Sequence, residues 1–235
     1  MTGITKGQAT AILTGTELGG HADKSYRVCL AVPNSLLGIS HGNNNSGFSF
    51  GVVQLDIANN NFAQTAYGQI LDLALAARQI TQAQHDHLAT YTGIPRPDLN
   101  AATSGVYAAD KALLNTLFAT PAAHQAVNDQ TNDYLASSLV PTVNKLLDAM
   151  AAKCGSSSVF DPGNPDHSLA YAAVTSMANR FGDLAGSTTF FLANLPNDIS
   201  VVKNRFLSLF QPSDWELIQT GAAMLQDYDA ANPAG

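Results

Sequence analysis

Apolar residues recur at helical spacing over most of this chain, and short polar or glycine-rich segments separate the apolar stretches. Near the N-terminus, Thr5 and Gln8 fit a capping box, with a threonine N-cap and a glutamine three positions later. The apolar residues that follow are three and four positions apart, which places them on one helix face. Gly19 and Gly20 are expected to stop this helix, so Glu17 falls at or near its C-terminal end.

Two later segments have the composition of β-strands. Residues 26–32 and 48–55 are rich in β-branched and aromatic side chains. Between them, residues 41–47 combine histidine, glycine, asparagine and serine, which is a strong turn signal. The pattern therefore predicts a small antiparallel hairpin region.

From residue 62 onward the pattern is helical. Helices are predicted over residues 66–79, 81–92, 106–119, 122–152, 168–181, 198–210 and 213–228. Thr81, Asp198 and Ser213 are the expected N-caps of three of them, because short polar side chains accept hydrogen bonds from the first free N–H groups of a helix. Pro141 is expected to interrupt or kink the longest helix, since proline has no N–H to donate.

Together these elements predict a mainly α fold of the α+β class. No repeat stands out, and no linker is long enough to force two domains. A chain of this length can bury one sizeable core. We therefore expect a single domain over residues 1–235, with the first helix and the hairpin in residues 1–60 and a helical lobe in residues 61–235.

Composition narrows the classes of function. Hydrophobic residues make up 46% of the chain and charged residues only 12%, which excludes a disordered acidic chain. The formal net charge of −7 and the absence of any Lys/Arg cluster argue against a nucleic-acid partner. No run reaches the ~18 apolar residues of a membrane span. Abundant small and amide side chains indicate a neutral, hydrogen-bonding surface that suits carbohydrate.

Cys29 and Cys154 are the two cysteines of the chain. They could form one disulfide, which would require an oxidising compartment, or remain as two buried thiols. No Cys/His spacing matches a structural zinc site, so neither a metal nor another cofactor is expected.

Glu17 is one of only two glutamates and lies in a glycine-rich stretch, residues 15–20. A general acid for glycoside cleavage must still hold its proton near neutral pH. Partial burial against an apolar helix face disfavours the charged form of a carboxyl group, and the negative end of a helix dipole does the same. This position suits a general acid, although a surface carboxylate beside a flexible loop is the simpler alternative.

A helix that ends at Glu17, a hairpin with the sequence Ser-Phe-Gly-Val-Val-Gln at residues 49–54, and a following helical lobe resemble the lysozyme-like superfamily. That group includes lysozymes, lytic transglycosylases, chitosanases and related chitinases. The resemblance covers mainly residues 5–60. It implies a lysozyme-like fold with Glu17 as the general acid, and Ser49 and Gln54 as contacts to substrate or water. It also implies an amino-sugar polymer as substrate, with peptidoglycan ahead of chitosan or chitin.

The second catalytic group has more than one candidate. Asp56 shares strand parity with Gln54, so both would point to one face, where Asp56 could activate water. Asp56 could instead cap the next helix, through residues 56–59. Asp23 is a lower-ranked candidate, and some members of the resembled group work with one glutamate and use an acetamido or hydroxyl group of the sugar. His41 and Asn59 are added as possible contacts to the sugar.

Two further classes remain open at this stage. Gly47-Phe-Ser-Phe-Gly51 fits the G-x-S-x-G nucleophile elbow of a serine hydrolase, with His167 and Asp161 as partners of Ser49. The elbow needs a strand before the serine and a helix after it, which the pattern does not predict. Alternatively, the chain is a non-enzymatic helical binding module, for example a structural part of a phage.

The expected place of action follows from the proposed substrate. The N-terminus lacks the basic and apolar regions of a signal peptide. Secreted or periplasmic action would then fit a mature form, a phage product or an effector delivered by a secretion machine.

Overall fold

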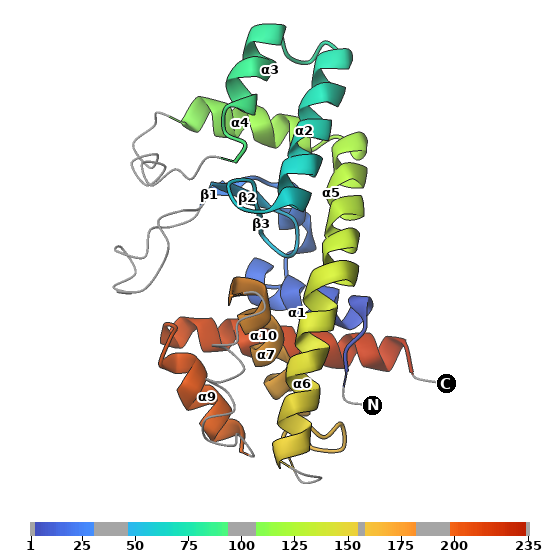
Figure 1. The fold of residues 1–235 in the computed structure, drawn as a ribbon, viewed down its shortest axis with the longest axis vertical. Helices are drawn as coiled ribbons and strands as arrows, with labels where there is room; N and C mark the ends of the chain where they lie inside the picture. The colour runs from blue at the N-terminus through green and yellow to red at the C-terminus, as the bar shows by residue number, and fades with distance from the viewer. Residues whose placement is uncertain (1–2, 31–46, 94–106, 155–157, 182–197, 234–235) are drawn as a thin grey trace. The chain divides into compact units, whose positions relative to one another are not determined.

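The computed structural model of the protein describes residues 3–30, 47–93, 107–154, 158–181 and 198–233. Helices dominate these residues, and three short strands form one small sheet (Figure 1). This arrangement confirms the predicted mainly α fold with a small antiparallel β region. His41 and most of the predicted turn lie outside the described residues.

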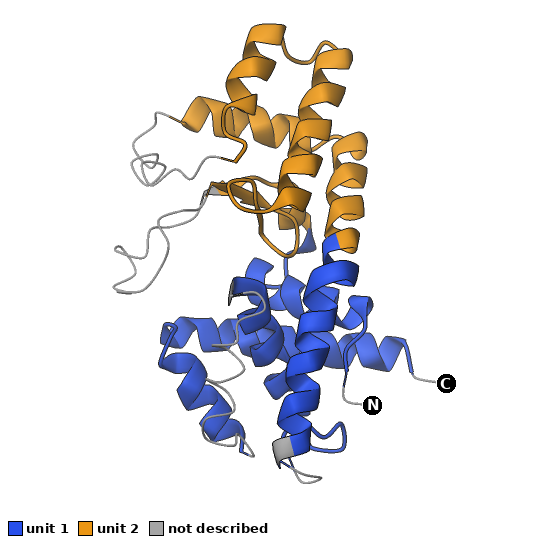
Figure 2. Cartoon of the chain, in the orientation of Figure 1, with its two compact units in different colours: residues 1–22, 134–235 blue, residues 23–133 orange. Residues whose placement is uncertain are grey.

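The chain divides into two compact units, which Figure 2 shows in different colours. Unit 1 combines Met1–Ala22 with Tyr134–Gly235, and unit 2 is Asp23–Asp133. The first helix therefore shares a unit with the C-terminal helices and not with the strands that follow it. This division differs from the predicted parts, residues 1–60 and 61–235, because both ends of the sequence build the core of unit 1.

Unit 1 is built around the contact between its first and last helices (Figure 1). Its helices are α1 (Lys6–Leu18), α6 (Val140–Cys154), α7 (His167–Phe181), α9 (Ile199–Leu207) and α10 (Pro212–Ala231). The predicted capping box of Thr5 and Gln8 starts α1. The face of α1 that includes Ile12 and Leu13 is buried and packs with α10 and α7.

Glycine makes this helix contact unusually close. A Cβ atom added to Gly15 of α1 would lie 2.4 Å from Cα of Gly221 in α10. A Cβ atom added to Gly221 would lie 2.8 Å from the carbonyl oxygen of Ile12. The two backbones therefore touch where a side chain on either residue would not fit, and dispersion contacts between backbones replace contacts between side chains.

The predicted interruption at Pro141 takes the form of a π-helical turn, η3 (Leu135–Leu139), between α5 (Pro121–Tyr134) and α6. The N–H of Val140 donates to the carbonyl of Leu135, five residues back. Proline in a helix removes one hydrogen bond and crowds the carbonyl four residues before it. The wider π turn before Pro141 relieves this crowding, so the helical path continues.

Unit 2 contains the sheet, whose strands are β1 (Cys29–Leu30), β2 (Phe48–Phe50) and β3 (Leu55–Asp56). The strand order is β1-β2-β3, and both pairs are antiparallel. Phe48 and Phe50 are buried and make edge contacts with Tyr91 and Phe118, with ring centroids 5.1 and 4.8 Å apart. These aromatic contacts join the sheet to the helical part of the same unit.

The strands are shorter than predicted. Residues Ala22–Tyr26 form a 3₁₀ helix, η1, so the first strand starts only at Cys29. Residues 51–54 form a turn in which Gly51 and Gln54 have φ angles of 78° and 52°. Positive φ is incompatible with a strand, so the predicted continuation of the second strand through Gln54 is wrong.

Three of the four predicted N-caps start helices in the structure. The remaining helices of unit 2 are α2 (Asn61–Ala76), α3 (Gln82–Ala89) and α4 (Ala108–Phe118). Thr81 and Asp198 cap α3 and α9 as predicted. Asn60 starts α2 five residues before the expected position, because its side chain accepts two backbone N–H groups. Gln211, and not Ser213, is the N-cap of α10, with Pro212 at the first helical position.

Candidate functional site

Glu17 lies in the last turn of α1, as the sequence predicts. Gly19 ends the helix in the left-handed conformation, with a φ angle of 60°. The Glu17 side chain is only 10% exposed. The carboxylate is therefore held within unit 1 and does not extend into bulk solvent.

Two residues of α7 contact Glu17. The hydroxyl of Ser176 and Nε of Arg180 both donate to Oε1 of Glu17, each at 3.4 Å. Ser176 and Arg180 are four residues apart, so they lie on the same face of α7. This face brings a neutral donor and a cationic donor to one carboxylate oxygen.

Arg180 also contacts a second carboxylate. Its Nη1 donates to Oδ1 of Asp214 in α10, again at 3.4 Å. The other oxygen of Asp214 accepts the backbone N–H of Gln211 at 2.9 Å, and the guanidinium lies 4.8 Å from the ring centroid of Phe210. The cation–π contact and the two ion pairs keep the arginine between the two carboxylates. We call Glu17, Ser176, Arg180 and Asp214 the Glu17 cluster.

Two buried threonine hydroxyls belong to residues that directly precede members of the Glu17 cluster in the sequence. Thr16 precedes Glu17, Thr175 precedes Ser176, and both threonines are fully buried. Neither hydroxyl has a hydrogen-bond partner among the described residues. Buried polar groups are paired in most structures, so these two hydroxyls are exceptions beside the cluster.

The surroundings of Glu17 differ from the apolar ones expected from the sequence. A hydroxyl and a guanidinium contact the carboxylate, whereas the sequence predicted an apolar helix face. A general acid at this position must therefore transfer its proton beside Arg180. Asp214 also pairs with Arg180, so the two carboxylates share one guanidinium.

Asp56 holds a turn in unit 2. Its Oδ1 accepts the backbone N–H groups of Gly47 at 2.7 Å and Ala58 at 2.9 Å. Its Oδ2 accepts Nδ2 of Asn59 at 3.0 Å. Two donors from the turn at residues 56–59 and one from Gly47, before β2, therefore engage this carboxylate. Asn60 caps α2, which is the role that was the alternative for Asp56.

The other predicted contacts to substrate also lie near the sheet. Ser49 is in the central strand, paired with Cys29 on one side and Asp56 on the other. Nε2 of Gln54 donates to the carbonyl of Gly51 at 3.1 Å, within the turn that Gln54 itself closes. The structure thus gathers Ser49, Gln54, Asp56 and Asn59 in unit 2, and gathers Glu17 with α7 and α10 in unit 1.

The lower-ranked candidates have local roles. Asp23 lies in η1, where it forms an exposed ion pair with Arg27 at 3.5 Å. Ser49 lies within a strand that is followed by a turn and another strand, whereas a nucleophile elbow joins a strand to a helix. Nδ1 of His167 lies 2.9 Å from the carbonyl oxygen of Asn164, just before α7.

The structure also tests the cysteine prediction. Cys29 and Cys154 are both free thiols and both half-buried. Of the two alternatives for Cys29 and Cys154, the disulfide is therefore wrong, and neither cysteine is a fully buried thiol. One residue belongs to the sheet of unit 2 and the other ends α6 of unit 1.

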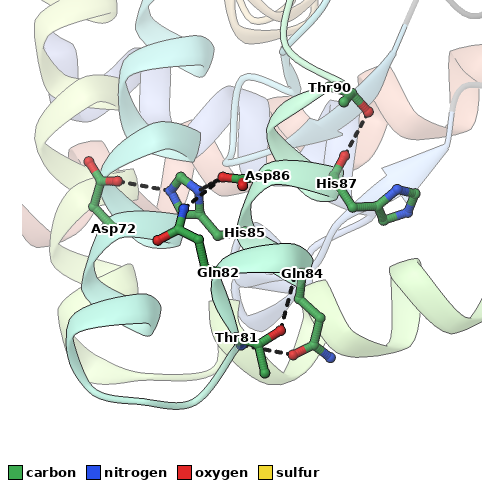
Figure 3. A network of polar contacts seen from close by, with 8 residues as sticks. All are labelled: Asp72, Thr81, Gln82, Gln84, His85, Asp86, His87 and Thr90. Atoms are coloured by element: carbon green, nitrogen blue, oxygen red, sulfur yellow. Dashed lines mark hydrogen bonds and ion pairs between the residues drawn. The ribbon is translucent and has the colours of Figure 1, made fainter.

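A separate polar network ties α3 to α2 (Figure 3). Nε2 of His85 lies 3.0 Å from Oδ1 of Asp72 in α2, and Nδ1 lies 3.3 Å from Oδ1 of Asp86. Hydrogen bonds to Asp72 first, and to Asp86 second, raise the pKa of His85 above its ordinary value. His87 points to a different partner, Asp110 in α4, at 2.8 Å. The two histidines therefore serve different contacts, because residues two positions apart do not share a helix face.

We expect protonated His85 to stabilise the contact between α2 and α3. Because the pKa of folded His85 is raised, this stabilisation is complete below about pH 6.5, the ordinary value for histidine, and is lost as pH rises through the folded value. Asp72→Asn should lower the titration midpoint of His85 more than Asp86→Asn does, as measured by NMR of the imidazole ring. An unchanged midpoint in Asp72→Asn would contradict this assignment.

Comparison with known proteins leaves function to be inferred from the structure. No family model, curated protein or solved structure matches this chain. Within the described residues, no helix has both the length and the apolar character needed to cross a membrane. Those residues also contain no group of three or more His, Cys, Asp or Glu side chains arranged to bind a metal ion. The fold defines a mainly α protein with a small antiparallel sheet and a carboxylate–guanidinium cluster.

The residues around Glu17 could not be found from local sequence patterns. Ser176 and Arg180 are 159 and 163 positions away from Glu17. The one available signal is their spacing of four on a predicted helix, which places both on one face. Nothing in the sequence indicates that this face meets the end of the first helix.

Proposed function

We propose that the protein is a glycoside hydrolase that cleaves β-1,4 bonds of an amino-sugar polymer, with Glu17 as the general acid. The observation that carries this proposal is the placement of Glu17. Its carboxylate is largely buried at a helix end, and Ser176 and Arg180 contact it from another helix. General acid catalysis requires a carboxyl group in a fixed orientation, and packed helices hold a side chain more firmly than loops do.

The proposed reaction requires one catalytic carboxyl group from the protein. Glu17 donates its proton to the glycosidic oxygen as the bond to the sugar breaks. The three donors that engage Asp56, two from its own turn and one from Gly47, favour a structural role for that residue. We therefore propose that the second group comes from the substrate, as an acetamido group or an internal hydroxyl, and keep Asp56 as the alternative.

Peptidoglycan is the favoured substrate, and chitosan or chitin comes next. A chain with 12% charged residues and many amide and hydroxyl side chains suits a polymer that is recognised by hydrogen bonds. We propose Ser49, Gln54 and Asn59 as contacts to sugar or water, with His41 as a further contact. Action would take place in the cell wall, outside the cytoplasm.

Purified cell walls, chitosan and chitin provide the direct test of this proposal. The wild-type protein should reduce the turbidity of walls or release reducing ends from one of the polymers. Mass spectrometry of the fragments then separates hydrolysis, which leaves reducing ends, from transglycosylation, which leaves anhydro-sugars. A folded protein that releases no fragments from any of the three polymers would refute the proposal.

One observation favours a second candidate function, a non-enzymatic helical binding module. Arg180 and Ser176 both donate to the Glu17 carboxylate. A buried carboxylate that only stabilises the fold would need the same donors. In that case the protein should bind its target without cleaving it. Retained wall binding with no released fragments would distinguish this module from an enzyme.

A further inference from the structure

We propose that Arg180 and Asp214 are positioning residues for Glu17, and that Arg180 shifts between the two carboxylates as Glu17 loses and regains its proton. This inference rests on the proposed function, because it concerns the same carboxyl group. Arg180 contacts Glu17 through Nε and Asp214 through Nη1, each at 3.4 Å. The arginine thus touches both carboxylates at once without a short bond to either.

Charge balance within the cluster supports this exchange. One guanidinium faces two carboxylates, so the cluster has a net charge of −1 when both are ionised. Like charges that share one site favour uptake of one proton by the pair. Among the elements packed against α1, α7 contributes Arg180, α10 contributes Asp214, and η3 has no charged residue. The hydroxyl of Ser176, which also donates to Glu17, is neutral.

The two states of the cluster match the two halves of glycoside cleavage. With the proton on Glu17, Arg180 and Asp214 form a neutral pair, and the acid is ready. When Glu17 gives its proton to the leaving oxygen, the glycosidic C–O bond breaks, and Arg180 stabilises the new carboxylate. In hydrolysis, water then returns a proton to Glu17 while its hydroxide adds to the sugar. Phe210 remains beside the guanidinium at 4.8 Å and limits its movement.

Two substitutions should move the pH profile in opposite directions. Arg180→Gln removes the cation, so Glu17 retains its proton to higher pH, and the alkaline limb of kcat/KM should move up by about one pH unit. Asp214→Asn leaves Glu17 as the one carboxylate of the cluster beside Arg180. The alkaline limb of kcat/KM should therefore move to lower pH. Arg180→Lys should give an intermediate profile, because one ammonium group keeps the charge but cannot form both contacts in the same geometry.

Matched controls separate this role from general loss of stability. Asp198→Asn removes a carboxylate that caps α9 by accepting the N–H of Ser200, and within the described residues Asp198 forms no hydrogen bond or ion pair with the Glu17 cluster. Arg27→Gln removes an exposed arginine that pairs with Asp23. Both controls should keep the wild-type pH profile. A purely structural role for Arg180 and Asp214 predicts lower stability in both variants without opposite shifts.

The two glutamates of the chain allow a test that does not depend on activity. Protein labelled with ¹³C at the side-chain carboxyl of glutamate should give two signals, from Glu17 and from the exposed Glu216. The pH at which the Glu17 signal titrates should rise in Arg180→Gln and fall in Asp214→Asn, while the Glu216 signal stays unchanged. Shifts in the same direction, or no shifts, in folded variants would overturn the inference.

The two proposals fail in distinguishable ways. Opposite shifts of the Glu17 signal in a protein that cleaves none of the polymers would refute the glycosidase proposal and retain the charge exchange. An active enzyme whose Arg180 and Asp214 variants keep the wild-type profile and signal would refute the exchange alone. Far-UV circular dichroism and the fluorescence of Trp215, the single tryptophan, verify that each variant is folded.

Discussion

Glu17→Gln is expected to lower the rate of fragment release from the preferred polymer by roughly 10²- to 10⁴-fold, the usual contribution of a general acid. Glutamine has nearly the same shape and retains a carbonyl oxygen that can accept from Ser176 and Arg180. It has no acidic proton to give to the leaving oxygen. Arg180 keeps Asp214 as a partner, so the substitution leaves no unpaired charge in the cluster. Initial rates on walls or chitosan, with binding measured in parallel, provide the test.

The matched control is the other glutamate of the chain. Glu216 is exposed on α10, and Glu216→Gln should retain the wild-type rate. Binding of Glu17→Gln to the polymer should also remain, since only a proton donor is lost. If Glu17→Gln remains within about threefold of the wild-type rate, well below the general-acid range, Glu17 is not the acid. If it loses activity only because it unfolds, circular dichroism will show this.

Gly221→Ala should destabilise unit 1 by about 2 kcal/mol or more, as overpacked cores do. The new Cβ would lie 2.6 Å from Cγ2 of Thr16 and 2.8 Å from the backbone oxygen of Ile12. A backbone oxygen cannot move aside as a flexible side chain can, so α1 and α10 must separate. The higher helix propensity of alanine, worth up to about 1 kcal/mol, offsets only part of this cost.

Denaturant unfolding followed by the fluorescence of Trp215 reports on unit 1, because this buried tryptophan lies in α10. Gly15→Ala should behave like Gly221→Ala, since its Cβ would meet the backbone of Gly221 at 2.4 Å. Both variants should also move Glu17, which is two residues beyond Gly15. They are therefore expected to lose activity together with stability.

Gly68→Ala is the control for the effect of glycine itself. Gly68 lies inside α2, and a Cβ there would have no atom within 4 Å. Alanine should therefore raise stability by about 0.5–1 kcal/mol through helix propensity alone. Circular dichroism can follow both types of variant. A Gly221→Ala protein as stable as wild type would show that the two helices are not in close contact.

Local signals in the sequence predicted the helical elements well. Thr5, Thr81 and Asp198 cap helices where expected, and Pro141 marks the change in helix geometry. These features depend on hydrogen bonds between residues two to five positions apart, so a short window contains both partners. The strands were less well predicted, because strand composition did not indicate the positive φ angle at Gln54.

The sequence alone determined that Glu17 lies in the last turn of the first helix, since the capping box and Gly19 set both limits of that helix. Only the tertiary structure decided what surrounds the carboxylate. The side chains that contact Glu17, or its partner Arg180, come from helices about 160 residues or more away along the chain. They are Ser176, Arg180 and Asp214. Packing of α1 on α7 and α10 depends on close contact between distant glycines and apolar faces, and no local pattern encodes which faces meet.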